Sequence, residues 1–178
     1  MLERQSDISD VKGSEVMFFK KRKKDNKAIT AHSPLNGEVI ELDNVPDPVF
    51  SQKMMGEGIG FIPKNGEVFS PVNGKITQIF PTQHAIGMLT EEGVELLIHL
   101  GLETVELKGE GFHIEVNVGD ELQINDRIGT FDLEFIEEKG KKTISVLVFP
   151  NMEEKLDINV LKTGEVNAGT GILELRLK

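Results

Sequence analysis

The chain contains no cysteine, tryptophan or tyrosine among its 178 residues. The absence of cysteine excludes disulfides, thiolate catalysis and zinc sites built on sulfur, and it agrees with a reducing cytosol. No stretch approaches the roughly 20 apolar residues that a membrane-spanning helix needs, and the N-terminus lacks the apolar run of a secretory signal. We therefore expect a soluble protein that works in the cytoplasm.

Basic residues are scarce outside one short cluster. The net charge is −10, yet six of the 20 Lys and Arg residues fall close together, at Lys20, Lys21, Arg22, Lys23, Lys24 and Lys27. Because the rest of the chain is more acidic still, nucleic acid is not expected as a partner. An acidic body favours fast association with basic protein surfaces, since opposite fields steer diffusion. We expect protein partners.

Residues 1 to 27 carry few large apolar groups and end in the basic cluster, which is typical of a segment that cannot bury enough surface to order itself. We predict a disordered basic tail over residues 1 to 27 and a β-sandwich domain over residues 28 to 178, which is long enough for its own core. Phe18 and Phe19 beside the lysines allow at most a peripheral contact with an anionic membrane. A plain extension of the chain is the simpler interpretation.

From residue 28 onward, short β-type runs are broken every few residues by Gly, Asn, Asp or Pro, which predicts an all-β fold, an antiparallel β-sandwich. The expected strands cover residues 29–32, 38–41, 58–63, 74–79, 85–89, 95–100, 127–132, 143–149 and 172–177. One or two short helices are also expected. Asp132 can cap one that ends near Gly140, and Asn151 with Glu154 resembles a capping box.

An internally duplicated motif is visible as two similar segments 37 residues apart, SPLNGEV at residues 33–39 and SPVNGKI at residues 70–76. In each, a Pro-x-Asn-Gly turn leads into a strand, and we expect Asn-Gly to supply the positive φ angles of a tight hairpin. Two copies are too few for a solenoid, so we predict two related sheet motifs packed face to face.

Two histidines, His84 and His99, flank the turn Thr90-Glu91-Glu92-Gly93. If the hairpin has a two- or four-residue loop, His84 lies directly opposite His99 and both imidazoles share one face. If Gly93 is left-handed in a three-residue bulged loop, the register moves by one and the rings fall on opposite faces. We expect the first register.

The segment VELLIHLG at residues 94–101 is apolar enough to be buried on both faces, so His99 needs a reason to be there. A lone histidine in such a strand would most simply be a core residue bonded to carbonyl groups. A second imidazole beside it favours a site instead, with one neutral nucleophilic nitrogen near pH 7. Thr82, two residues before His84, has the spacing to fix the tautomer of that ring.

Two chemistries remain open from spacing alone. One is covalent phosphoryl transfer through a histidine, and the other is a zinc site of two histidines with a carboxylate such as Glu103. The sequence has no Walker-type glycine loop, no Gly-x-Ser-x-Gly and no His-Glu-x-x-His. Nucleotide hydrolysis, serine hydrolysis and helical zincin chemistry are therefore not indicated.

The stretch GVELLIHLGLETVELKGEGF at residues 93–112 resembles the characteristic segment of glucose-type enzyme IIA proteins of the bacterial sugar phosphotransferase system. VPDPVF at 45–50, MGEG at 55–58 and PVNG at 71–74 are also similar to that family. The resemblance runs from about residue 28 to the C-terminus. It implies a cytoplasmic phosphocarrier with a β-sandwich fold, a phosphotransferase component that forms a phosphohistidine and requires no cofactor.

By the same resemblance, the phosphoryl group is carried on His99, His84 stabilises it, and Thr82 orients His84. The donor would be phospho-HPr and the acceptor the cysteine of an enzyme IIB domain of a sugar permease. An apolar ring that docks both partners would consist of Val49, Phe50, Met54, Met55, Phe80 and Leu97. Asp47 and Glu103 are further expected partner contacts, Glu103 standing where relatives often place an aspartate that meets an arginine of HPr.

Pro48, Met54 and Met55 depart from the residues common at these positions, so the sequence does not specify the sugar. Two alternatives remain beside the phosphocarrier. The protein could be a regulatory binding module whose phosphorylation state controls permeases or metabolic kinases. It could also be a two-histidine metal-dependent hydrolase, and incidental zinc at His84 and His99 fits either case.

Overall fold

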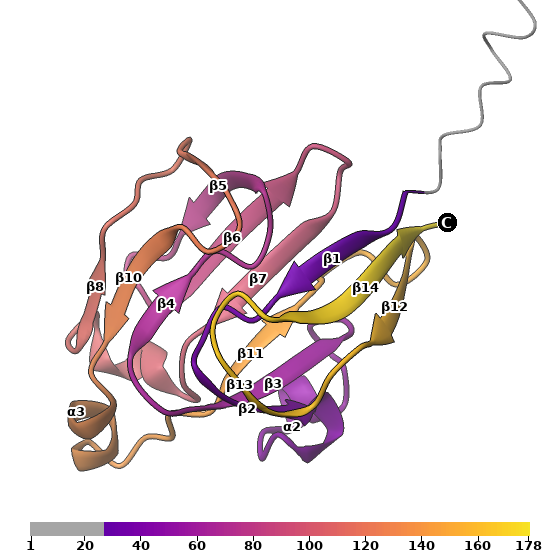
Figure 1. Cartoon of the computed structure of the whole chain (residues 1–178). Coiled ribbons are helices and arrows are strands. Elements are labelled where there is room, and N and C mark those ends of the chain that lie inside the picture. Colours follow the sequence, from indigo (N-terminus) through magenta and orange to yellow (C-terminus); the bar gives the residue numbers. More distant parts are fainter. Residues whose placement is uncertain (1–26) are drawn as a thin grey trace, which may run out of the picture.

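Short antiparallel strands joined by tight turns make up most of the structure, a computed structural model that describes residues 27–178 (Figure 1). The predicted tail, apart from Lys27, lies outside the described residues. Within them, no helix is both long and apolar enough to cross a membrane. The strands are β1 (Ile29–His32), β2 (Gly37–Glu41), β3 (Gly58–Pro63), β4 (Glu67–Phe69), β5 (Gly74–Ile79), β6 (Ala85–Thr90), β7 (Glu95–His99), β8 (Phe112–Ile114), β9 (Glu121–Leu122), β10 (Arg127–Phe131), β11 (Ser145–Val148), β12 (Leu156–Val160), β13 (Gly164–Val166) and β14 (Gly171–Leu177).

The expected strands are all present, with ends that differ by at most two residues. The helix predicted after Asp132 is α3 (Leu133–Glu138), and the Asp132 carboxylate accepts a hydrogen bond from Phe135 N as an N-cap. The helix predicted at Asn151 is wrong. Asn151 has φ 61°, and the chain makes one turn before it enters β12. The N-cap of a capping box normally has an extended backbone, which Asn151 lacks.

A helix that the sequence reading missed is α2 (Pro48–Ser51). Asp47 Oδ1 accepts from Val49 N at 2.9 Å, and Pro48 occupies the first helical position. Asp-Pro is a favourable start because the carboxylate caps a free N–H and proline has none to satisfy. The helix is a single turn, too short to produce a periodic apolar pattern. Two 3-10 turns, η1 (Leu42–Asn44) and η2 (Thr104–Leu107), complete the elements.

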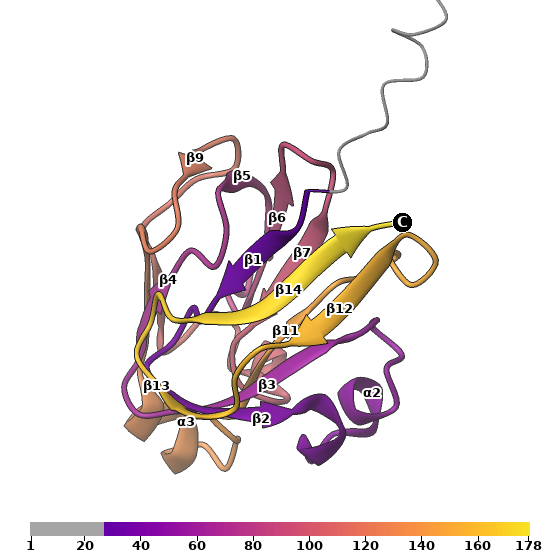
Figure 2. The same cartoon turned by 45° about the vertical axis from the view of Figure 1, so that its right-hand side comes forward.

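The large sheet has the strand order β13-β2-β3-β11-β7-β6-β5-β9. Two three-stranded sheets, β1-β14-β12 and β4-β10-β8, pack against it, and β14 crosses over its strands in both views of the ribbon (Figures 1 and 2). β11, at the centre, is buried at all four positions, and its residues are apolar except for Ser145. The all-β antiparallel sandwich predicted from sequence is therefore confirmed.

The duplicated motif is real, but the predicted face-to-face packing of its two copies is wrong, because β2 and β5 lie in the two halves of one sheet. His32 N donates to Pro71 O at 2.8 Å, and Phe69 N donates to Pro34 O at 2.9 Å, so the two segments bond each other reciprocally. Outward from the central pair, β11 is followed by β3, β2 and β13, and β7 is followed by β6, β5 and β9. The strands β2 and β5, which follow the two copies of the motif, hold the same place in the two halves. A pseudo-twofold axis therefore passes between β11 and β7.

The Asn-Gly pairs do not form the tight hairpins that we predicted. β1 and β2, on either side of the first pair, belong to different sheets, so the segment is a crossing between layers. Asn36 and Asn73 instead use their side-chain oxygens, which accept from Ala168 N and Ile124 N at 2.8 Å each. The two asparagines therefore suit these positions because their amide side chains bond the backbone of a neighbouring loop, and not because they form a hairpin turn.

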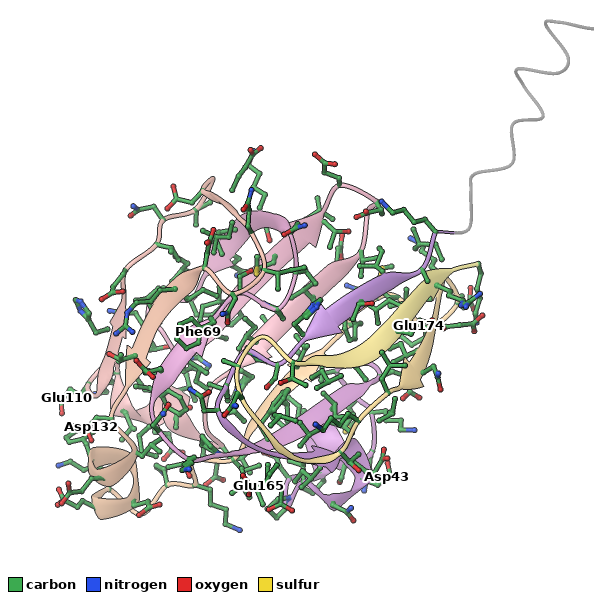
Figure 3. The ribbon with its side chains drawn as sticks, viewed as in Figure 1. Asp43, Phe69, Glu110, Asp132, Glu165 and Glu174 are labelled. Atoms are coloured by element: carbon green, nitrogen blue, oxygen red, sulfur yellow. The ribbon has the colours of Figure 1, made fainter. Side chains whose placement is uncertain are left out.

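Two apolar clusters lie on opposite faces of the central strands. The larger fills the space between the layers and includes Ile98 and Leu147. The smaller includes Leu97, Val146 and Phe50, and it lies on the outer face beneath η1 and α2. Acidic side chains, such as the labelled Glu110, Asp132 and Glu165, project from the rim (Figure 3).

Candidate active site

His99 is the last residue of β7 and lies at the middle of the large sheet. Its Cα pairs with Val146 of β11 on one side and with Ala85 of β6 on the other. Side chains of directly paired residues share one face of a sheet, and both neighbours are fully buried here. The imidazole therefore stands on an apolar floor on the outer face.

The β6–β7 hairpin has a three-residue loop, and the predicted direct opposition of His84 and His99 is wrong. Leu89 pairs with Glu95, Thr90 N donates to Val94 O at 3.0 Å, and Gly93 has φ 93°. Gly93 N also donates to Thr90 O, as a bulged loop requires. The register is thus the one that we expected to separate the two rings.

The two rings meet all the same, with centroids 4.9 Å apart and planes at 81°. His84 precedes the first residue of β6, so the alternation of side chains along a strand does not govern it. The chain reverses just before it: Gln83 N donates to Phe80 O at 2.7 Å, and Gln83 has φ 56°. A turn, and not the strand register, brings the second imidazole to the first.

The backbone after β7 fixes the tautomer of His99. Nδ1 lies 2.8 Å from the carbonyl oxygen of Gly101, and a carbonyl oxygen can only accept, so Nδ1 carries the proton. The neutral ring therefore has its lone pair on Nε2. Ser145 Oγ accepts from Gly101 N at 3.0 Å and donates to Thr143 O, which holds this loop in place.

His84 is 4% exposed, and its Nδ1 lies 2.6 Å from the Thr82 hydroxyl. The sequence prediction that Thr82 contacts this ring agrees with the geometry. A hydroxyl that donates to Nδ1 leaves the proton of the neutral ring on Nε2. In the tautomer in which the Thr82 hydroxyl is the donor, the pair presents one nitrogen with a lone pair, on His99, beside one N–H donor, on His84.

Burial is the main cause that lowers the pKa of His99 from 6.5 to about 4. The neighbouring His84 also lowers it, while the hydrogen bond to Gly101 and the charge of Asp47 raise it. Burial lowers the pKa of His84 as well. A ring with little access to water loses the hydration that stabilises its cation. Both imidazoles are therefore neutral at pH 7, as a nucleophilic nitrogen must be.

A pH titration tests this electrostatic picture. NMR spectra of the His99 ring nitrogens are expected to show a neutral imidazole from pH 7.5 down to about pH 5, with protonation centred near pH 4. In the unfolded chain the ring takes a proton near pH 6.5. The contribution of His99 to the free energy of unfolding is therefore fully present above pH 6.5 and is lost as the pH falls towards 4. For His99 alone this amounts to at most roughly 3 kcal/mol.

The control for that titration is the difference in unfolding free energy between the wild type and His99→Gln at each pH, because all other titrating groups cancel in the difference. The advantage of the wild type should shrink between pH 6.5 and 4. A midpoint for His99 near 6.5, or a difference that does not change with pH, would contradict the assignment.

A metal-dependent site receives no support from the geometry. Among residues 27–178, no group of three His, Cys, Asp or Glu side chains is placed to hold a metal ion. Glu103 is exposed, has φ 59° and begins η2, so the predicted zinc arrangement of two histidines with Glu103 is not formed. Catalytic zinc sites normally need three protein ligands. The hydrolase alternative is therefore disfavoured.

The residues expected to dock partners divide into two groups. Phe50 and Leu97 are 5% and 7% exposed, and the Phe50 ring meets the His99 ring edge to face at 4.9 Å. Met54 and Val49 are 68% and 41% exposed. The first group supports the imidazole, whereas the second exposes apolar area at the surface.

The remaining expected contacts lie close by. Phe80 is half-buried and meets the His84 ring at 5.4 Å, and Met55 is half-buried against the outer cluster. Asp47 caps α2 and acts on His99 through its charge. Contact of these residues, and of Glu103, with a partner stays a prediction.

Sequence reasoning missed Ser145, which anchors the Gly101 backbone. The available signal was a lone serine inside the apolar run of β11, a position that favours aliphatic residues. It also missed why residue 101 is glycine. Gly101 has φ 73°, and a Cβ there would lie 2.5 Å from a side-chain carbon of Thr104. No other residue fits without moving the acceptor of His99.

The chain is similar to known proteins over most of its length. Residues 29–155 match the family model described as phosphoenolpyruvate-dependent sugar phosphotransferase system, EIIA 1. The chain is 45% identical over 152 residues to the PTS system glucose-specific EIIA component of Staphylococcus aureus, covering 85% of this chain and 92% of that protein. The protein of the same name from Staphylococcus epidermidis is 46% identical over 143 residues, covering 80% and 86%. The solved structure of glucose permease IIA from Mycoplasma capricolum matches with a TM-score of 0.78 at 37% identity, covering 84% of this chain and 96% of that one.

Proposed function

The chain belongs to the EIIA family of the phosphoenolpyruvate-dependent sugar phosphotransferase system, and on that premise we propose that it is a phosphocarrier that takes a phosphoryl group from phospho-HPr onto His99 and passes it to a cysteine of an enzyme IIB domain. It acts in this role as a covalent intermediate in the cytoplasm and needs no cofactor. A glucose-specific relative makes glucose the first sugar to test.

The observation that carries the proposal is the hydrogen bond between His99 Nδ1 and the Gly101 carbonyl. It leaves Nε2 as the nucleophile of a neutral ring in an apolar setting. In the accepting step, a bond forms between His99 Nε2 and phosphorus, and the bond from phosphorus to the HPr imidazole breaks. In the donating step, the IIB thiolate attacks phosphorus, and the electron pair returns to Nε2.

His84 would stabilise the phosphoryl group between these steps. A phosphoryl dianion bound to His99 raises the pKa of the adjacent ring, because an opposite charge favours the imidazolium. The hydrogen bond with Thr82 keeps Nδ1 of His84 occupied, so its Nε2–H is the group left to face the anion. The apolar surroundings exclude water, which protects the phosphohistidine and strengthens the contact.

The direct test is to incubate the protein with enzyme I, HPr and phosphoenolpyruvate and to find the phosphoryl group. We expect one phosphoryl group per chain, and 15N and 31P NMR should show it on Nε2 of His99. Omission of HPr is the control, since enzyme I alone should not transfer. Phosphate on Nδ1, or on another residue, would contradict the proposed mechanism.

The exposed apolar residues beside the site support a second test, of docking. Met54→Asp should raise the KM for phospho-HPr about tenfold with little change in kcat, because a charge is then buried in an apolar interface. Leu161→Asp is the matched control, since Leu161 is 50% exposed and follows β12 in the other layer. Equal effects of the two variants would show that this face does not dock HPr.

A further inference from the structure

We propose that Gln83 is a positioning residue of this site, whose side chain fixes the turn that presents Thr82 and His84. The inference rests on the proposed function, because the ring that it positions is the one proposed to hold the phosphoryl group. Three observations support the proposal: the strained backbone of Gln83, a comparison of the two halves of the sheet, and contacts that hold the turn on two sides.

The backbone of Gln83 is in the left-handed region, with φ 56°. Residues with a Cβ disfavour this conformation, and glutamine lacks the short side chain that lets Asn or Asp tolerate it. Such residues persist where the surrounding structure holds them, and they are concentrated at functional sites. The strain at Gln83 therefore requires an explanation from its side chain.

The related half of the sheet has a glycine at the equivalent position, where a Cβ would lie 2.5 Å from the Phe149 carbonyl oxygen. The carbonyl oxygen of Glu57, just before β3, accepts a hydrogen bond at 2.9 Å from the backbone N–H of Phe149, the residue after β11. In the same way, the carbonyl oxygen of His84, just before β6, accepts one at 2.7 Å from the backbone N–H of Leu100, the residue after β7. Gly56 thus occupies the place of Gln83, and it is also left-handed, with φ 95°. The half without the histidines uses glycine, whereas the half with them keeps a long amide side chain.

That side chain reaches another sheet. Gln83 Oε1 accepts from Ile114 N of β8 at 3.1 Å, and β8 belongs to the small sheet β4-β10-β8. The bond links residues 31 apart in the sequence. The turn before His84 is therefore tied to a layer that contains neither histidine.

The loop after η2, at Gly109, packs against the same turn. A Cβ built on Gly109 would lie 4.0 Å from the Thr82 Cα and from the Pro81 carbonyl oxygen, so the backbone of that loop lies against the turn. Held in this way on both sides, Thr82 keeps its hydroxyl 2.6 Å from His84 Nδ1. Loss of the Gln83 bond should loosen the hydroxyl and the ring together.

The experiment measures His84 itself in the unphosphorylated full chain, by 15N NMR of its imidazole across pH, together with denaturant unfolding and transfer to IIB. Gln83→Gly should be at least as stable as the wild type, since glycine relieves the strain. It should nevertheless mix the two tautomers of His84 and slow transfer about tenfold, as expected for the loss of one hydrogen bond. Gln83→Met should do the same, and Gln83→Glu, which keeps an acceptor for Ile114 N, should retain the wild-type tautomer of His84.

Thr82→Val defines the spectrum of a His84 without its partner, and Asn73→Ala is the structural control. Asn73 Oδ1 accepts from Ile124 N, a comparable bond outside the site. The proposal fails if Gln83→Gly and Gln83→Met leave the tautomer and titration of His84 unchanged, or if Asn73→Ala alters them equally. If no variant accepts a phosphoryl group while His84 responds as expected, the proposed function falls and this inference stands.

Discussion

Replacement of His99 by alanine is expected to lower phosphorylation by phospho-HPr at least about a thousandfold, to the limit of detection. His99 Nε2 is the nitrogen that the Gly101 hydrogen bond leaves with a free lone pair. His84 cannot substitute, because it is 4% exposed and its Nδ1 faces the Thr82 hydroxyl. Removal of a covalent nucleophile eliminates the pathway and does not merely weaken it.

His99→Gln keeps a donor near Gly101 and fills much of the same volume, so it separates loss of the nucleophile from loss of packing against Phe50. His113→Ala is the matched histidine control, since His113 lies in β8, with a side chain that is 74% exposed. It should accept label at the wild-type rate. Labelling of His99→Ala or His99→Gln at the rate of the wild type would refute the role of His99.

The two histidines illustrate how far the sequence could lead. An apolar strand around His99 and a turn at Thr90 were enough to predict β6 and β7, but the second ring was expected nearby from a register that the structure contradicts. The loop length was not predictable, because Gly93 is compatible with both a bulged loop and a tighter one, and the choice depends on backbone geometry. The rings meet because of the turn at Gln83, where no sequence rule predicts a left-handed glutamine.

The supports of the site were hidden for a similar reason. Ser145 and Gly101 are 44 residues apart, and the bond between them exists only because β11 pairs with β7. Sequence patterns report local periodicity, whereas such a bond depends on the order of strands in the sheet. The duplicated segments did predict two related motifs, which the bonds from His32 N to Pro71 O and from Phe69 N to Pro34 O join, but the predicted face-to-face packing is wrong, because both motifs lie in one sheet.

The pseudo-twofold axis also explains why the site is at the centre of the sheet. His99 pairs with Val146, and Leu97 pairs with Val148, so the axis relates His99 to Val148 and His84 to Glu57. One half of the sheet thus has an aliphatic side chain, Val148, where the other has His99. Burial near the axis gives His99 its apolar floor, which lowers its pKa, while the end of β7 leaves one nitrogen accessible.

His84→Gln is expected to accept a phosphoryl group within about tenfold of the wild-type rate but to pass it to enzyme IIB at least about a hundredfold more slowly. The two steps differ in charge. A neutral imidazole of His99 attacks in the accepting step, whereas a thiolate approaches a phosphoryl dianion in the donating step, and the added repulsion needs a compensating positive charge. Glutamine can donate a hydrogen bond, but it cannot become a cation as His84 does beside the dianion.

Single-turnover transfer from the isolated phosphorylated variant to IIB measures this step alone, and His113→Ala again provides the control. Thr82→Val should show a smaller defect in the same step, because His84 is then present but less well oriented. The phosphorylated His84→Gln protein should therefore accumulate when all components are present, since the first step outruns the second. Normal transfer to IIB by this variant would remove the role proposed for His84, and equal slowing of both steps would mean that the ring holds His99 in place and does not act on the charge of the phosphoryl group.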